Sequence, residues 1–213
     1  MKKVLILGAN GHTSQEIIPR LLNQDNIGIT LFIRNMNDNL TFIHPKINYV
    51  QGDALNINDL KKAMQGQNII VSTLGGMDLD IKTSNIIQAM QYNSIERLIA
   101  INAGGIYDEL PEPFNSWDKK MVGYTRPINL KAANLIESSQ LQYTILRPIW
   151  LTNKPIETFE LTYKGEPFKG TETSRASIAK IIVDIIKDPS IQTRKNIGIS
   201  QPNTDGTKPL AYQ

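Results

Sequence analysis

The sequence contains no cysteine, and its only histidines are His12 and His44, in a chain of 213 residues. The lack of thiols excludes disulfides, thiolate nucleophiles and zinc–thiolate sites. Two histidines are too few for a histidine-rich metal site. We therefore expect a protein without a metal centre.

Long apolar segments are also missing. Residues 1–7 begin like a signal peptide, but the polar residues Asn10, His12 and Gln15 follow at once. No stretch approaches the roughly 20 apolar residues that a membrane span requires. The net charge is only +3, and the basic residues form no run typical of a nucleic-acid footprint. We expect a cytoplasmic protein that binds neither a membrane nor nucleic acid, and that is a monomer or a homodimer.

Short apolar runs alternate with segments of helical periodicity along the whole chain. With 40% hydrophobic and 20% charged residues, the composition is typical of a globular protein and not of a disordered one. Strands are predicted over residues 4–7, 29–33, 47–50, 69–73, 97–102, 143–147 and 196–200, and helices from about residue 13 and over 56–65, 80–92, 126–139 and 174–186. This alternation predicts one α/β domain over residues 1–213: a Rossmann fold with a doubly wound, mostly parallel sheet, helices on both faces and strand order 3-2-1-4-5-6.

Two segments have no regular pattern and are predicted to form a small substrate region. Residues 104–124 contain two prolines and four aromatic residues, and residues 149–173 are irregular, with a hairpin expected around Lys164-Gly165. Thr125 and Ser174 are predicted to cap the helices that follow them. The polar tail from Gln201 onward is expected to be frayed.

A glycine-rich turn, Gly8-Ala9-Asn10-Gly11-His12-Thr13-Ser14, joins the first predicted strand to the first predicted helix. Gly8 allows the tight exit from the strand, and Gly11 lacks a Cβ, so the backbone can approach a pyrophosphate closely. The helix N-terminus offers unpaired N–H groups and a partial positive charge. Ser14 supplies the small residue needed where the helix packs on the strand. In this strand–turn–helix context, the pattern predicts a dinucleotide site.

The residues after the second strand indicate which dinucleotide binds. Arg34 and Asn35 stand where NAD-binding proteins carry an acidic residue, and the next carboxylate is Asp38. A guanidinium can bind a 2′-phosphate through two hydrogen bonds, whereas a carboxylate would repel it. We therefore predict NADP(H) in preference to NAD(H), the alternative for Arg34 being a solvated surface residue.

Other polar residues near the turn allow two interpretations each. His12 could contact a phosphate or the nicotinamide, or it could be a solvated loop residue, which is the interpretation we favour. His44 lies beside Pro45 and is predicted to be a turn residue. Asp53, followed by Ala54 after the third strand, could accept a hydrogen bond from the adenine amino group or serve only as a turn residue.

The landmarks occur in an order that resembles a known family. They are Gly8 to Ser14, Arg34, Gly52-Asp53, Thr73-Leu74-Gly75, Arg147-Pro148 and Ser174-Arg175. From residue 2 to about 200 the chain resembles the atypical short-chain dehydrogenases/reductases, and within them the NAD(P)H-binding group that includes NmrA-like proteins and biliverdin/flavin reductases.

The resemblance implies where the remaining cofactor contacts lie. Thr73, Leu74 and Gly75 would line the adenosine and ribose side. Near the nicotinamide it implies Asn102, Ala103 and Lys131, with Pro148, Ile149 and Trp150 closing over the ring.

The chain departs from the catalytic pattern of many short-chain dehydrogenases. Their helper serine is replaced by Ala103, and their proton-donating tyrosine by Pro127, four residues before Lys131. Lys131 matches the lysine of the pattern and is a candidate catalytic residue, or else a solvated helix residue. Tyr124 is a candidate replacement acid, although Pro127 makes a continuous helix between it and Lys131 doubtful. Without an acid of this kind, alcohol or ketone chemistry is disfavoured.

Two functions remain open. The first is hydride transfer from NADPH to a flat conjugated acceptor, such as a flavin or quinone, that takes its proton from solvent. The aromatic residues Tyr107, Phe114, Trp117 and Trp150 could form its stacking surface, or could simply pack the loop. The second is a non-catalytic NADP(H) redox sensor of NmrA type that signals to a partner protein. An epimerase or dehydratase is disfavoured, because the tyrosine and a large C-terminal domain are both missing.

Overall fold

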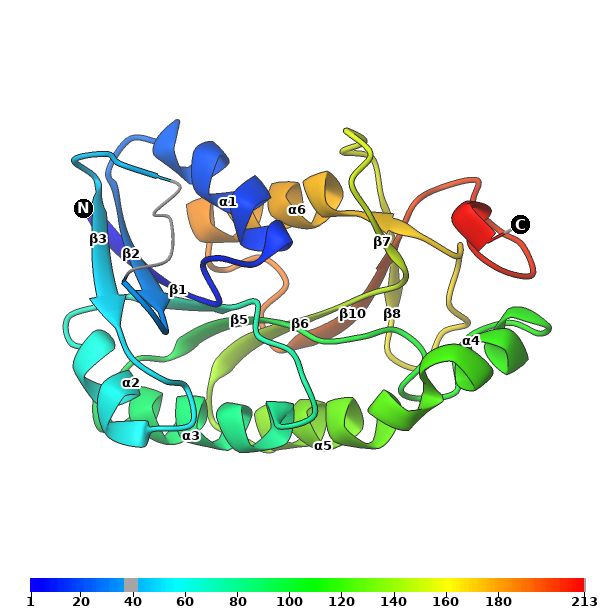
Figure 1. Ribbon diagram of the computed structural model, residues 1–213, viewed down its shortest axis with the longest axis horizontal. Coiled ribbons are helices and arrows are strands. Elements are labelled where there is room, and N and C mark those ends of the chain that lie inside the picture. The colour runs from blue at the N-terminus through cyan, green and yellow to red at the C-terminus, as the bar shows by residue number, and fades with distance from the viewer. Residues whose placement is uncertain (37–41, 213) are drawn as a thin grey trace.

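The computed structural model describes residues 1–36 and 42–212 (Figure 1). Its strands are β1 (Lys2–Leu7), β2 (Ile27–Ile33), β3 (Ile47–Gln51), β4 (Ile69–Ser72), β5 (Arg97–Ile101), β6 (Gln142–Pro148), β7 (Leu151–Thr152), β8 (Glu160–Tyr163), β9 (Thr173–Ser174) and β10 (Lys195–Ser200). Its α-helices are α1 (His12–Leu22), α2 (Ile57–Ala63), α3 (Leu79–Tyr92), α4 (Phe114–Val122), α5 (Arg126–Glu137) and α6 (Arg175–Lys187), and its short 3-10 helices are η1 (Gly123–Thr125) and η2 (Leu210–Tyr212).

The main sheet has the order β3-β2-β1-β4-β5-β6-β10-β8. Every pairing from β3 to β10 is parallel, and β8 adds an antiparallel edge strand. The predicted Rossmann fold and the predicted order of the first six strands are confirmed. The central strands read as unbroken apolar runs because helices cover both of their faces, as in other parallel sheets.

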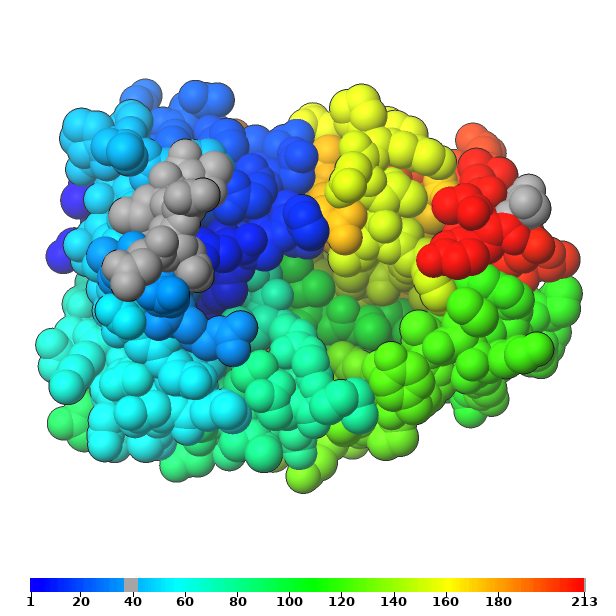
Figure 2. All heavy atoms as spheres, viewed as in Figure 1, coloured from blue at the N-terminus to red at the C-terminus, as the bar shows by residue number. Residues whose placement is uncertain are grey.

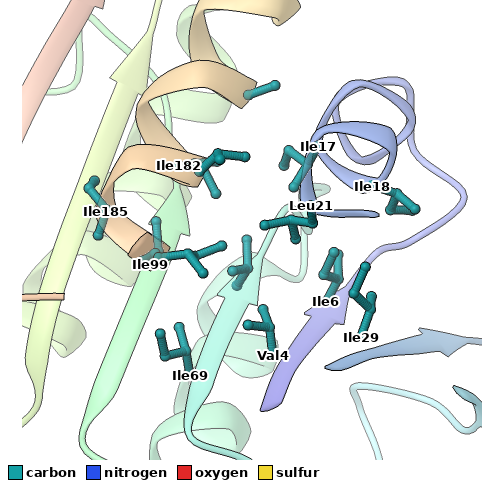
Figure 3. Close-up of a cluster of buried hydrophobic side chains, with 14 of the residues drawn as sticks. Val4, Ile6, Ile17, Ile18, Leu21, Ile29, Ile69, Ile99, Ile182 and Ile185 are labelled. Carbon is teal, nitrogen blue, oxygen red and sulfur yellow. The ribbon is translucent and has the colours of Figure 1, made fainter. Parts of the chain in front are cut away.

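Alternate residues of β1 supply the two halves of the core. Val4 and Ile6 point to the layer of α1 and α6, where they pack with Ile17, Leu21 and Ile182 (Figure 3). The residues between them point to the opposite layer, formed by α2, α3 and α5. Burying one such side chain stabilises the fold by about 1.5–3 kcal/mol. This packing fixes the carboxyl ends of the strands, where the site lies.

The segment predicted to be irregular over residues 104–124 contains regular structure. Helix α4 begins directly after Pro113, and η1 links it to α5. The two prolines made the segment look like a loop, but a proline at the start of a helix costs no hydrogen bond. Thr125 does precede α5, yet its hydroxyl donates to the carbonyl of Val122 and does not cap that helix. Ser174 caps α6 as predicted, accepting from the amide of Ser177 over 3.0 Å.

Two expectations for the C-terminal half are wrong. Lys164-Gly165 forms a turn but no hairpin of neighbouring strands, because β8 pairs instead with the distant β10, with Tyr163 opposite Ile197. Nor is the tail frayed from Gln201, whose side chain is buried and accepts from the amide of Ser174 over 3.0 Å. Long-range contacts determine the conformation of both segments, and the local amino-acid composition gives no indication of these contacts. In the described residues, no helix is long and apolar enough to cross a membrane.

Candidate functional site

The glycine-rich turn lies between β1 and α1 and is held by two hydroxyl groups. The hydroxyl of Ser14 donates to the carbonyl of Gly8 over 3.0 Å and lies 2.9 Å from Oγ1 of Thr73. Gly8 has a φ of +86°, and a Cβ on it would lie 2.7 Å from the same Thr73 atom. Glycine is therefore required at this position for both its conformation and its size.

Helix α1 begins at His12 with its amino end directed at this turn. Gly11 occupies the cap position in an extended conformation, and no side chain of the described residues caps the helix. A Cβ on Gly11 would lie 3.2 Å from the carbonyl oxygen of Gly8. The first-turn N–H groups and the positive end of the helix dipole are thus available to an anion.

A first cavity, of about 330 Å³, opens beside the turn. In Figure 2 the surface is hollowed between the blue segments of α1 and the cyan-to-green segments below them. The structure brings together here most of the residues predicted for the phosphate and adenosine end: Gly8, Asn10, Gly11, Arg34, Asp53, Ala54, Thr73, Leu74 and Gly75. They come from the carboxyl ends of β1, β2, β3 and β4, which are neighbours in the sheet.

Four predicted residues do not line this cavity. His12 is exposed on the first turn of α1, and Thr13 and Ser14 are buried behind the turn. Asn35 follows Arg34 on the surface, and Asp38 lies outside the described residues. Asp53 lines the cavity and also serves as a turn residue, because its carboxylate accepts from the amide of Leu55 over 2.9 Å.

Sequence reasoning missed two charged residues of the first cavity, Asp78 and Lys82. Nζ of Lys82 donates to Oδ1 of Asp78 over 2.6 Å and to the carbonyl of Gly75 over 3.1 Å. The hydrogen bond from Lys82 holds the pKa of Asp78 below its ordinary value. The available signal was positional: both residues stand at the start of the helix that follows the fourth strand.

A second cavity, of about 270 Å³, lies at the carboxyl ends of β5 and β6. It includes five residues predicted for the nicotinamide end: Asn102, Ala103, Pro148, Ile149 and Trp150. The others were missed: Gly104, Asp118, Val122, Thr125, Arg126 and Leu151. Three of these, Asp118, Val122 and Thr125, come from α4 and η1, elements that the sequence did not predict.

One wall of the second cavity is fixed by the buried carboxylate of Asp118. It accepts from Nη2 of Arg126 over 2.6 Å and from the indole nitrogen of Trp150 over 2.8 Å. Trp150 has a φ of +30°, which is rare for a residue with a large side chain. The carboxylate thus holds both a cation and an aromatic ring against the cavity.

The aromatic residues of this region form a cluster that includes an unexpected member. Ring centroids of Trp117 and Trp150 lie 4.7 Å apart, and Tyr212 lies 5.4 Å from the first and 5.1 Å from the second. Phe114 stacks on Trp117 at 6.1 Å. Tyr107, which was expected to belong to the same surface, is elsewhere: its hydroxyl accepts from Asn196 over 2.8 Å.

The two candidate catalytic residues lie outside both cavities. Lys131 is largely exposed on α5, and its Nζ contacts Oδ2 of Asp80, on α3, at 2.6 Å. Tyr124 is also exposed, on η1. Pro127 occupies the first turn of α5, so the helix begins only after Tyr124. The geometry therefore gives neither residue a reacting partner.

A buried ion pair joins the loop after β5 to β6. Nη1 of Arg147 pairs with Oε1 of Glu109, and its Nε donates to Asn196 over 2.7 Å. Glu109 also accepts from the amides of Gly105 and Tyr107, over 3.0 and 2.8 Å. Burial lowers the pKa of Arg147 from its usual value. This pair fixes the loop that carries Gly104 into the second cavity.

Known proteins resemble this chain in sequence and in fold. The chain belongs to the NAD(P)H-binding family, whose model matches residues 8–189. It is 42% identical to a Rossmann-fold NAD(P)-binding family protein from Shigella flexneri (TM-score 0.82; 99% of this chain, 98% of that one). It is 28% identical to a Veillonella parvula short-chain dehydrogenase/reductase solved with NADP (TM-score 0.91; 98% and 99%). ChuY, an anaerobilin reductase from Escherichia coli O157:H7, shares the fold at 20% identity (TM-score 0.84; 96% and 100%).

These relatives support the atypical short-chain dehydrogenase/reductase group, and the residues present fit its nucleotide. The uncapped end of α1 suits the pyrophosphate, and Cβ-free Gly8 and Gly11 give it room. Among the described residues, no group of three or more His, Asp or Glu side chains could hold a metal ion.

Proposed function

We propose that this protein is an NADP(H)-dependent reductase that transfers a hydride to a flat conjugated acceptor, such as a flavin, a quinone or a linear tetrapyrrole. The observation that carries the proposal is the composition of the second cavity. Its lining in the described chain combines an indole and apolar side chains with the polar or charged residues Asn102, Asp118, Thr125 and Arg126, but contains no tyrosine, serine or lysine. Asp118 and Arg126 are paired with each other, and the hydroxyl of Thr125 donates to the carbonyl of Val122. The cavity can therefore bind and orient a flat molecule, and it lacks the tyrosine that protonates a carbonyl in many short-chain dehydrogenases.

The order of the two cavities along the sheet supports this function. The first spans the ends of β1 to β4, and the second begins at β5, the neighbour of β4. A dinucleotide bound with its pyrophosphate on α1 would therefore extend toward the second cavity. When bound there, NADPH would supply the hydride, and an acceptor in the second cavity would take it together with a proton from solvent. The protein contributes proximity and exclusion of competing reactions.

Two further observations support the choice of cofactor and acceptor. Arg34 lines the first cavity, where its fork of donors suits a 2′-phosphate, and the Veillonella relative was solved with NADP. The fold neighbour ChuY is named as a reductase of anaerobilin. Trp150 would give a planar acceptor of that kind a surface for stacking.

The test is an acceptor screen with the purified protein. NADPH oxidation is followed by loss of its fluorescence in the presence of a flavin, a naphthoquinone or biliverdin. A Gly8→Val variant, which cannot form the turn, serves as the control for reaction without bound nucleotide. We expect oxidation with at least one acceptor by the wild type only. Equal rates for the two proteins would contradict the proposal.

The observation that favours the second candidate function, an NADP(H) redox sensor, is the position of Lys131. That residue, the one member of the usual catalytic pattern present at its expected position, is exposed and paired with Asp80 and lines neither the first nor the second cavity. A sensor would bind NADPH and NADP⁺ without turnover, and its affinity for a partner protein would differ between the two states. Tight binding of both forms with no acceptor reduced would favour this function.

A further inference from the structure

The first cavity contains a charge cluster that the usual dinucleotide fingerprint does not include. Lys82 stands in the first turns of α3 with its side chain only 17% exposed, and Asp78 stands directly before that helix. Both line the cavity together with Arg34. Two cations, Arg34 and Lys82, and two carboxylates, Asp53 and Asp78, therefore line the same cavity.

The side chain of Asp78 does not cap α3, although the residue stands at the cap position. An aspartate before a helix ordinarily accepts from amides of the first turn. Here no such cap is formed, and the carboxylate contacts Nζ of Lys82 at 2.6 Å instead. The charge of Arg34 also contributes, to a smaller extent, to the low pKa of Asp78. Asp78 is thus the counter-ion of Lys82, in a cavity that Arg34 also lines.

The loop before α3 is shaped to accommodate this pair. Gly76 has a φ of +106°, and a Cβ on it would lie 2.9 Å from Oδ1 of Asp78 and 3.7 Å from Nζ of Lys82. The carbonyl of Gly75 accepts from Lys82 on the same side. Bare backbone on this side therefore leaves room for the ammonium group beside the carboxylate.

We propose that Lys82 is a second cation of the 2′-phosphate subsite, beside Arg34, and that Asp78 holds it in place until the phosphate replaces the carboxylate. The inference rests on the NADP(H) preference proposed above. An ammonium group has three donors, so Lys82 can keep its bond to Gly75 while it donates to a phosphate oxygen. A carboxylate beside a phosphate dianion is repelled, so Asp78 opposes NADPH more than NADH.

The experiment compares two probes that differ only in the 2′-phosphate: adenosine 2′,5′-bisphosphate and 5′-AMP, each titrated calorimetrically. For Lys82→Met we expect affinity for the bisphosphate to fall by about tenfold, and affinity for 5′-AMP to stay within about twofold. Lys82→Arg should retain most of the affinity for the bisphosphate. Asp78→Asn should raise that affinity by about threefold, a gain that Lys82→Met abolishes in the double variant.

A matched control and the contrary results make the test decisive. Lys180→Met removes a comparable ion pair, with Asp184 on α6 at 2.8 Å, outside both cavities, and should change neither affinity. If Lys82→Met lowered the affinity for both probes equally, the role of Lys82 would be to hold the carbonyl of Gly75 in place. That result would overturn the proposal. If Asp78→Asn bound 5′-AMP more weakly than the wild type, the carboxylate of Asp78 would contact the ribose. That result would also overturn the proposal.

The same probes separate this inference from the proposed reductase activity. Neither contains a nicotinamide, so the expected pattern of affinities can appear in a protein that reduces no acceptor, and only the reductase function would then fail. If the wild type binds the two probes equally well, there is no 2′-phosphate subsite. That result would overturn both the role of Lys82 and the preference for NADP(H).

Discussion

The two cavities of this protein are built by different means. The first is formed by backbone at four successive strand ends, with Gly8, Gly11 and Gly75 in its wall. The second depends on side chains from segments far apart in the sequence, joined by Asp118 to Arg126 and Trp150, and by Glu109 to Arg147. The absence of side chains at glycine positions thus shapes the first cavity, whereas contacts between particular side chains shape the second.

This difference determines how each cavity can fail. A site formed by backbone loses its ligand when a side chain is added to its wall, and the stability of the rest of the fold need not change. A site held by buried ion pairs fails when a partner is removed, because an uncompensated charge then remains in the interior. The following variants, from the largest expected effect to the smallest, test this contrast.

Glu109→Ala should have the largest effect on stability. It leaves the guanidinium of Arg147, which is 1% exposed, without its carboxylate and leaves two loop amides without an acceptor. We expect the free energy of unfolding to fall by about 3–5 kcal/mol in urea denaturation. Arg147→Met combined with Glu109→Leu should lose less, because no charge is left buried. A double variant as unstable as the single one would contradict this account.

Gly8→Val should abolish binding to the first cavity at a smaller cost in stability. The new Cβ would meet Thr73 at 2.7 Å in a backbone conformation that valine disfavours. We expect about 1–3 kcal/mol of destabilisation and loss of measurable NADPH binding by fluorescence titration. Gly75→Ala is the control in the same cavity, since nothing lies within 4 Å of a Cβ there. It should fold as well as the wild type.

Tyr212→Ala should loosen the second cavity while sparing the first. The ring contacts Trp117 and Trp150 with centroids 5.4 and 5.1 Å away. We expect a loss of about 1 kcal/mol in stability and a shift in tryptophan emission toward that of exposed indoles. Affinity for NADPH should change by less than that for a flat acceptor. An unchanged emission spectrum would show that the C-terminal turn leaves the cluster uncovered.

Lys131→Met should have the smallest effect, although the sequence marked this residue as catalytic. Its Nζ pairs with Asp80 at the surface, and that hydrogen bond lowers the pKa of Asp80. A carboxylate with a lowered pKa stabilises the fold above its unfolded pKa, and this stabilisation is lost as pH falls through the folded value. We expect a decrease in Tm of no more than about 2 °C at neutral pH, vanishing in acid, with unchanged turnover. A large loss of turnover would restore the catalytic assignment.

The same contrast explains what could be predicted from the sequence. The first cavity lies where strands marked by apolar runs end, so Gly8, Gly11 and Arg34 carry a local signal from which the sequence predicts them. The six-strand order follows from apolar runs such as residues 4–7. By contrast, α4 was hidden by Pro111 and Pro113, which resemble loop residues although a helix starts directly after the second.

Long-range pairing accounts for the remaining errors. The partner of β8 is β10, more than thirty residues further along, and no local pattern reveals it. Tyr212 reaches Trp117 and Trp150 only because Gln201 is anchored in the core. Lys131 and Tyr124 are candidates because of their spacing to a family pattern, and that spacing carries no information on whether they line the two cavities, which in the structure they do not.

The antiparallel strand β8 has a consequence for how this fold can diversify. The chain between β6 and β10 leaves the sheet, adds β8 to its edge and returns, so both ends of the excursion are pinned by main-chain hydrogen bonds. Since β8 is the edge strand and pairs with β10, it lies outside the seven parallel strands, β1 to β6 and β10, that hold the nucleotide turn. The connection from β7 to β8 can therefore vary in length more readily than the strand ends that carry the nucleotide turn.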